Sequence, residues 1–157
     1  MSKSTYLAFR KEYSDITLRL TTEAVVADIA AQKADKVTAL WDTGAMLSSV
    51  TPAIARNLNL IPTNKIKVNG VNNISMADVT RLTIELPNQV VLQNIKVVIC
   101  NLVEGIDLLI GMDIIKLGDL SISNGGGKTL FSFAIPPFDD KTDFYEKAVA
   151  RNETKNL

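Results

Sequence analysis

Short apolar segments separated by turn-forming residues recur along most of the chain, and this pattern restricts the fold more than any other feature. Ile16, Leu18 and Leu20 alternate with polar residues, which is the two-residue period of a half-buried β-strand. The segment 82–86 shows the same alternation. Further strands are predicted at 37–41, 66–68, 90–92, 95–99, 106–110, 120–123 and 130–135.

Helical patterns are few and brief. Thr51 is a suitable N-cap, followed by Pro52 at the first helical position of a segment that reaches residue 60. A second short helix is predicted at 112–117, ended by Gly118. Many short strands with one or two short helices predict an all-β fold, either a small closed barrel or a sandwich.

The length of 157 residues fits one domain. We expect the folded domain to span 1–138, because charged residues dominate the stretch from 139 to 157. That stretch is predicted to be a solvated helix or a disordered tail.

Composition excludes several functions. The chain has no histidine and one cysteine, which excludes Ser-His and Cys-His catalysis, histidine metal sites and multi-cysteine zinc clusters. Basic and acidic residues number 17 each, so charge gives no reason to expect nucleic acid or an anionic membrane as partner. The charged N-terminal segment lacks an apolar signal region, and no apolar run is long enough to span a membrane, so we expect a cytoplasmic location.

The informative motif is Asp42-Thr43-Gly44-Ala45, at the end of an apolar strand. Glycine permits a tight turn that can hold the carboxylate in place, and the threonine hydroxyl can form local or intermolecular hydrogen bonds. A second element, Leu109-Ile110-Gly111, ends a later apolar strand.

These two motifs, in this order, resemble those of the retropepsin-like aspartic proteases of the bacterial single-domain type. The resemblance covers roughly residues 16–135 and implies a small closed β-barrel, the acid protease fold. It implies an aspartic endopeptidase that needs no metal and no cofactor, with Asp42 as the catalytic residue. Its substrate would be an extended peptide or protein.

Aspartic protease chemistry needs two carboxylates that share one proton. The chain contains one Asp-Thr-Gly, so the second carboxylate must be Asp42 of another copy, and a homodimer is predicted. The resemblance further implies that Thr43, Gly44, Ala45, Ile110 and Gly111 support the active-site loop.

The resemblance also implies a flap between residues 65 and 80 that closes over the substrate. Its tip is expected at Gly70, Val71, Asn72, Asn73 and Ile74, where the asparagines and glycine suit a turn.

An alternative is a catalytically weak or silent binding or dimerisation module that keeps the protease fold. Met112 follows Gly111 where retroviral members carry arginine, and the flap tip is poorer in glycine than usual. Asp113 is expected to be solvated or to cap a helix. A third, weaker alternative is that the β domain binds a small apolar ligand.

Overall fold

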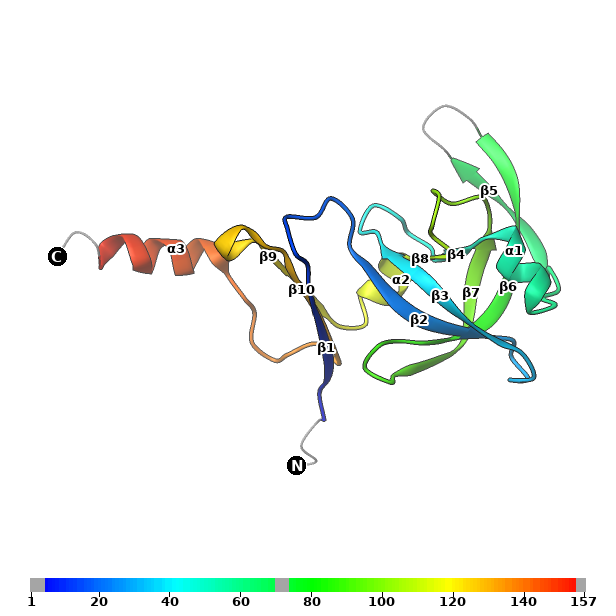
Figure 1. Cartoon of the computed structure of the whole chain (residues 1–157), viewed down its shortest axis with the longest axis horizontal. Helices are drawn as coiled ribbons and strands as arrows, with labels where there is room; N and C mark the ends of the chain where they lie inside the picture. Colours follow the sequence, from blue (N-terminus) through cyan, green and yellow to red (C-terminus); the bar gives the residue numbers. More distant parts are fainter. Residues whose placement is uncertain (1–4, 70–73, 155–157) are drawn as a thin grey trace.

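The computed structural model describes residues 5–69 and 74–154 (Figure 1). In these two ranges strands dominate, together with three α-helices and one 3₁₀ turn. In chain order the elements are β1 (Leu7–Glu12), β2 (Thr21–Ala27), β3 (Ala34–Trp41), β4 (Ser49–Val50), α1 (Pro52–Asn57), β5 (Asn64–Asn69), β6 (Ile74–Glu85), β7 (Val91–Ile99), β8 (Leu108–Ile110), α2 (Met112–Ile115), β9 (Asp119–Ser123), η1 (Gly125–Gly127), β10 (Leu130–Ile135) and α3 (Phe144–Glu153).

The central sheet closes into a six-stranded barrel, which confirms the predicted fold class. Its strand order is β2-β3-β8-β4-β7-β6, and β6 pairs back onto β2 through the register Val26↔Ile84. β5 pairs with the outer part of β6 as an antiparallel hairpin, with the register running from Asn64↔Val79 to Asn69↔Ile74. Closure limits the free edges of the barrel strands, and β5 stands outside the ring.

Alternating side chains of the barrel strands face one interior. In β3 the residues Val37, Ala39 and Trp41 are buried, as the two-residue period requires. Leu82 and Ile84 of β6, also predicted from alternation, have no exposed surface. Thr51 caps α1 with a hydrogen bond from the Ile54 amide to its Oγ1, as predicted from the sequence.

Three strands near the chain ends form a second sheet, in the order β1-β10-β9, which we name the terminal sheet. Aromatic side chains join it to the barrel: Trp41 of β3 lies 4.8 Å from Phe133 and 5.3 Å from Phe131 between ring centroids. Both phenylalanines belong to β10 and are buried. The residue that precedes Asp42 is therefore anchored between the two sheets.

α3 extends away from the barrel beyond the terminal sheet (Figure 1). None of its residues is buried. Asp143 caps the helix by accepting hydrogen bonds from the amides of Tyr145 and Glu146. No helix in the described ranges is long and apolar enough to cross a membrane.

The strand predicted around Ile16, Leu18 and Leu20 is wrong, because the chain there is an irregular connection between β1 and β2. The Thr17 hydroxyl donates to the Arg19 carbonyl and accepts from the Arg19 amide, at 2.9 and 3.2 Å. These local bonds replace the ladder bonds that a strand would make. The regular strand begins only at Thr21.

Candidate active site

Asp42 directly follows β3, at the point where the parallel strand β8 also ends. The register Trp41↔Ile110 places the two strand ends side by side, so Asp42 lies next to Gly111. The Asp42 amide donates to the Ile110 carbonyl at 2.9 Å. Its half-buried carboxylate accepts a hydrogen bond from the Gly44 amide at 2.8 Å, which holds the side chain over the turn.

The loop that follows Asp42 is tied along its length to the start of α2. The Met112 amide donates to the Ala45 carbonyl at 2.8 Å, and the Asp113 amide donates to the Met46 carbonyl at 3.2 Å. Backbone hydrogen bonds thus join two segments that are far apart in the sequence. These bonds limit the movement of the loop and of the carboxylate that it carries.

Gly111 is required by the closeness of these two segments. A Cβ atom at this position would lie 2.9 Å from the Ala45 oxygen and 2.9 Å from the Leu47 carbonyl carbon. Both are backbone atoms that cannot rotate away. A Cβ on Gly44 would lie 3.2 Å from Oδ1 of Asp42, so the motif glycine also leaves room for the carboxylate.

A pair of side chains, the buried Ser48 and the half-buried Asp113, supports the loop from behind and was not predicted from the sequence. Both carboxylate oxygens of Asp113 accept from Ser48, one from its amide at 3.0 Å and one from its hydroxyl at 2.8 Å. The Ser48 hydroxyl oxygen also accepts from the Gly111 amide at 3.1 Å. Oδ1 of Asp113 also accepts from the Ile114 amide in the first turn of α2 at 3.1 Å. Asp113 therefore bonds to the start of a helix, as expected, but it is not solely solvated, and its bonds to Ser48 were not predicted. No local sequence pattern links these two residues, which lie 65 positions apart.

The structure brings together all the predicted residues of the active-site loop and its support. Thr43 and Gly44 are exposed, Ala45 is half-buried, and Ile110 is fully buried behind them. The Thr43 hydroxyl makes no hydrogen bond to any described residue. Their roles in catalysis stay predictions, since position alone does not test them.

The structure describes only part of the predicted flap. Gly70, Val71, Asn72 and Asn73 lie outside the described residues. Ile74 is the first residue of β6, and the paired strands β5 and β6 lead to this segment.

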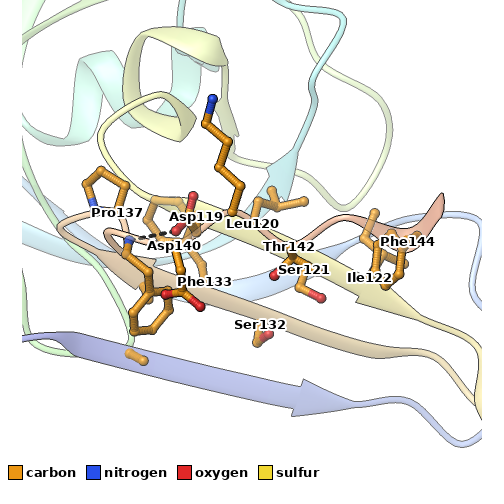
Figure 2. A pocket seen from close by; sticks show the side chains of 14 residues that line it. Asp119, Leu120, Ser121, Ile122, Ser132, Phe133, Pro137, Asp140, Thr142 and Phe144 are labelled. Carbon is orange, nitrogen blue, oxygen red and sulfur yellow. Dashed lines mark hydrogen bonds between the residues drawn. The ribbon is translucent and has the colours of Figure 1, made fainter. Parts of the chain in front are cut away.

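The surface beside Asp42 is hollowed. Within the described ranges, no group of three or more acidic or cysteine side chains is placed to hold a metal ion. A groove of about 370 Å³, here called the Asp42 groove, is lined by Asp42 and Thr43 together with the β1–β2 connection and the end of β9. A cavity of about 720 Å³ lies elsewhere, against the terminal sheet and the segment that leads to α3 (Figure 2).

Comparison with known proteins agrees with this arrangement. The family model of gag-polyprotein putative aspartyl proteases matches residues 27–117, which include the Asp42 loop and Gly111. No curated protein matches the chain in sequence.

Among solved structures, the chain is similar to a retropepsin-like aspartic protease from Rickettsia conorii, with 17% identity, a TM-score of 0.55 and coverage of 86% of this chain and 98% of that one. Simian foamy virus protease matches with 18% identity, a TM-score of 0.44 and coverage of 61% and 91%. EIAV protease, solved with the inhibitor HBY-793, matches with 21% identity, a TM-score of 0.46 and coverage of 66% and 89%.

The family model covers more than half of the chain, and the Rickettsia structure shares its fold over most of its length. The chain belongs to the gag-polyprotein putative aspartyl protease family and has the retropepsin-like fold.

Proposed function

We propose that the protein is an aspartic endopeptidase that hydrolyses peptide bonds through a water molecule activated by two Asp42 carboxylates, one from each subunit of a homodimer. The observation that carries this proposal is the position of Asp42. Its carboxylate accepts a hydrogen bond from the Gly44 amide, at the rim of a closed barrel. The loop that carries it is hydrogen-bonded to the start of α2. A rigidly held carboxylate in a family of aspartyl proteases suits acid–base work.

The reaction divides between the two carboxylates. Because two carboxylates about 3 Å apart cannot both be ionised without a large free-energy cost, one Asp42 is ionised and the other protonated. The ionised group takes a proton from water as the water oxygen attacks the scissile carbonyl carbon. The protonated group gives its proton to the carbonyl oxygen, and a tetrahedral diol forms.

The diol then collapses and restores the pair. The carboxyl group that took the water proton gives it to the leaving nitrogen as the C–N bond breaks. The other carboxylate takes a hydroxyl proton from the diol, so the starting protonation returns. A single Asp42 cannot perform both roles in one step, which is why the proposal includes a homodimer.

The proposal gives supporting roles to the residues around Asp42. The exposed Thr43 hydroxyl, without a partner among the described residues of its own chain, is free to bond across the two-fold axis. Ile110 and Gly111 keep the loop rigid from behind. The β5–β6 hairpin serves as the flap over an extended peptide, which binds as an additional strand.

The test is cleavage of an unfolded protein or a peptide library, read by mass spectrometry, with wild type and Asp42→Asn at equal concentration. We expect wild type to produce new termini and Asp42→Asn to lose at least about three orders of magnitude in rate, with an unchanged unfolding temperature and solution mass.

Asp35→Asn is the matched control, since Asp35 lies on the same strand at the end distant from the site. It should cleave like wild type. Equal activity of Asp42→Asn and wild type would overturn the proposal. A wild-type dimer without cleavage at any pH from about 3 to 8 would favour the binding module instead.

A further inference from the structure

The peptide group between Ile110 and Gly111 is hydrogen-bonded on both of its sides. Its carbonyl oxygen, on Ile110, accepts from the Asp42 amide at 2.9 Å. Its N–H, on Gly111, donates to the hydroxyl oxygen of Ser48 at 3.1 Å. Ile110 has no exposed surface and Gly111 is buried, so this peptide group is shielded from water. The backbone position of Asp42 therefore depends on what holds Ser48.

Asp113 holds Ser48 by two hydrogen bonds. The Ser48 hydroxyl has a single proton, which it donates to Oδ1 of Asp113 at 2.8 Å, and the Ser48 amide donates to Oδ2 at 3.0 Å. Because the hydroxyl proton points at Asp113, a lone pair of the same oxygen is left to accept from Gly111. Ser48 has no exposed surface, so water cannot take over either role.

These hydrogen bonds form one chain, here called the Asp113 chain, in which every donor points the same way. The first bond joins the Asp42 amide to the Ile110 carbonyl. The second leaves the same peptide group through the Gly111 N–H and reaches the Ser48 hydroxyl, and the third ends on the Asp113 carboxylate. Hydrogen bonds in such a chain polarise one another, and a charged acceptor at the end strengthens the bond made to it.

The donors around Asp113 require a carboxylate rather than an amide. Oδ1 also accepts from the Ile114 amide at 3.1 Å, so three donors converge on the side chain and both of its oxygens accept. In an asparagine one of the two terminal atoms would be an NH₂ donor. That group would face either the Ser48 amide, which is itself a donor, or the Ser48 hydroxyl, which would then lose its acceptor. Either orientation loses a bond that Asp113 makes.

We propose that Asp113 is a positioning residue for Asp42 and acts on it through the Asp113 chain. This inference rests on the proposed function, in which the two Asp42 carboxylates of the homodimer lie about 3 Å apart. A displacement of about 1 Å at a reacting group can lower the rate about a hundredfold. Loss of the chain should therefore lower kcat much more than it raises KM, because the change concerns where Asp42 stands and not how the peptide is bound.

The experiment compares Asp113→Asn and Ser48→Ala with wild type, by peptide cleavage kinetics and thermal unfolding of the same preparations. At a temperature where every variant is folded, each should lower kcat at least about tenfold and leave KM within about twofold of wild type. The double variant should be about as slow as either single variant, since both substitutions break the same chain.

Asp107→Asn is the matched control. Asp107 is also half-buried, and its carboxylate also accepts from a backbone amide, that of Thr38, at 3.1 Å. It lies directly before β8, at the end of that strand opposite to Gly111. Asp107→Asn should keep the wild-type kcat even where it unfolds at a lower temperature.

Amide proton chemical shifts measure the Asp113 chain without any cleavage. In Asp113→Asn we expect the amide protons of Gly111 and Asp42 to move upfield, as weakened hydrogen bonds do, whereas in Asp107→Asn they should stay in place. Wild-type kcat and wild-type shifts in Asp113→Asn would overturn the inference and leave the proposed function standing. An equal loss of kcat in Asp107→Asn would also overturn it, since the loss would then reflect strand packing in general. If wild type cleaves no substrate, the proposed function fails and the positioning role fails with it.

Discussion

Gly111 is the residue at which the packing of the site is tightest. Its backbone lies so close to Ala45 and Leu47 that an added methyl group must displace one of the two segments. We expect Gly111→Ala to lower the free energy of unfolding by about 1–3 kcal/mol, as overpacking of a tight contact does. Because the displaced segment carries Asp42, cleavage should fall by more than the loss of folded protein explains. Thermal unfolding and cleavage rates on the same preparation measure both effects.

Gly125→Ala is the control at this scale, because no heavy atom lies within 4 Å of a Cβ at that position. It should leave stability within about 0.5 kcal/mol of wild type, as expected of a surface substitution. A Gly111→Ala protein as stable and active as Gly125→Ala would show that the loop yields freely and that its rigidity is not needed.

The residues of the loop differ in how far sequence predicts them. Asp42, Gly44 and Gly111 are local motifs, readable because strand, acid and glycine are neighbours in the chain. The bond between Ser48 and Asp113 joins positions 65 apart, and neither residue has a pattern that names the other. The antiparallel pairing of β4 with β8, in which Ser49 lies opposite Leu109, brings them together, and that pairing is a property of the barrel.

At the scale of elements, most strands with strong local patterns were predicted, whereas β1, β2 and the two-residue β4 were not. β10 was predicted to the residue, since five of the six residues in Leu130–Ile135 are apolar. β1 was missed, because Arg10, Lys11 and Glu12 follow its apolar residues and its pairing, Leu7↔Ile135, spans almost the whole chain. The alternation at 16–20 misled because the Thr17 hydroxyl satisfies the backbone locally.

Among the helices of residues 5–69 and 74–154, α3 alone contributes no buried side chain. None of its residues is buried, so its removal exposes little apolar surface. The segment before it is anchored at Phe138, whose amide donates to Asp119 at 2.7 Å and whose ring stacks on Tyr6. We expect a chain of residues 1–138 to unfold within about 2 °C of the full chain and to cleave at the same rate. Circular dichroism melts and peptide cleavage measure this.

The contrasting truncation is a chain of residues 1–129, which lacks β10. It loses the buried Phe131 and Phe133 and the partner strand of both β1 and β9, so we expect no cooperative unfolding. A loss of stability or of dimer in the 1–138 chain would place part of the tail in the folded domain or its interface, against the predicted boundary.

At the scale of the whole molecule, the barrel supplies a single Asp-Thr-Gly loop, and the proposed chemistry needs two. The closed barrel, the terminal sheet and the loop that is hydrogen-bonded to α2 together hold one carboxylate at one place on the chain. Completion of the site is then a property of an assembly. An assembly can be tested by mixing subunits, without knowledge of the natural substrate.

Mixing wild type with Asp42→Asn separates a shared site from a site within one chain. If subunits exchange freely, each wild-type chain paired with a variant chain forms an inactive dimer. At a fixed wild-type concentration, an equal amount of Asp42→Asn should lower cleavage to about one half, and a ninefold excess to about one tenth, by random pairing. Asp35→Asn added in the same amounts should not lower it. Cleavage that is indifferent to Asp42→Asn, once exchange is verified by the mass of mixed dimers, would place the whole reaction within one chain.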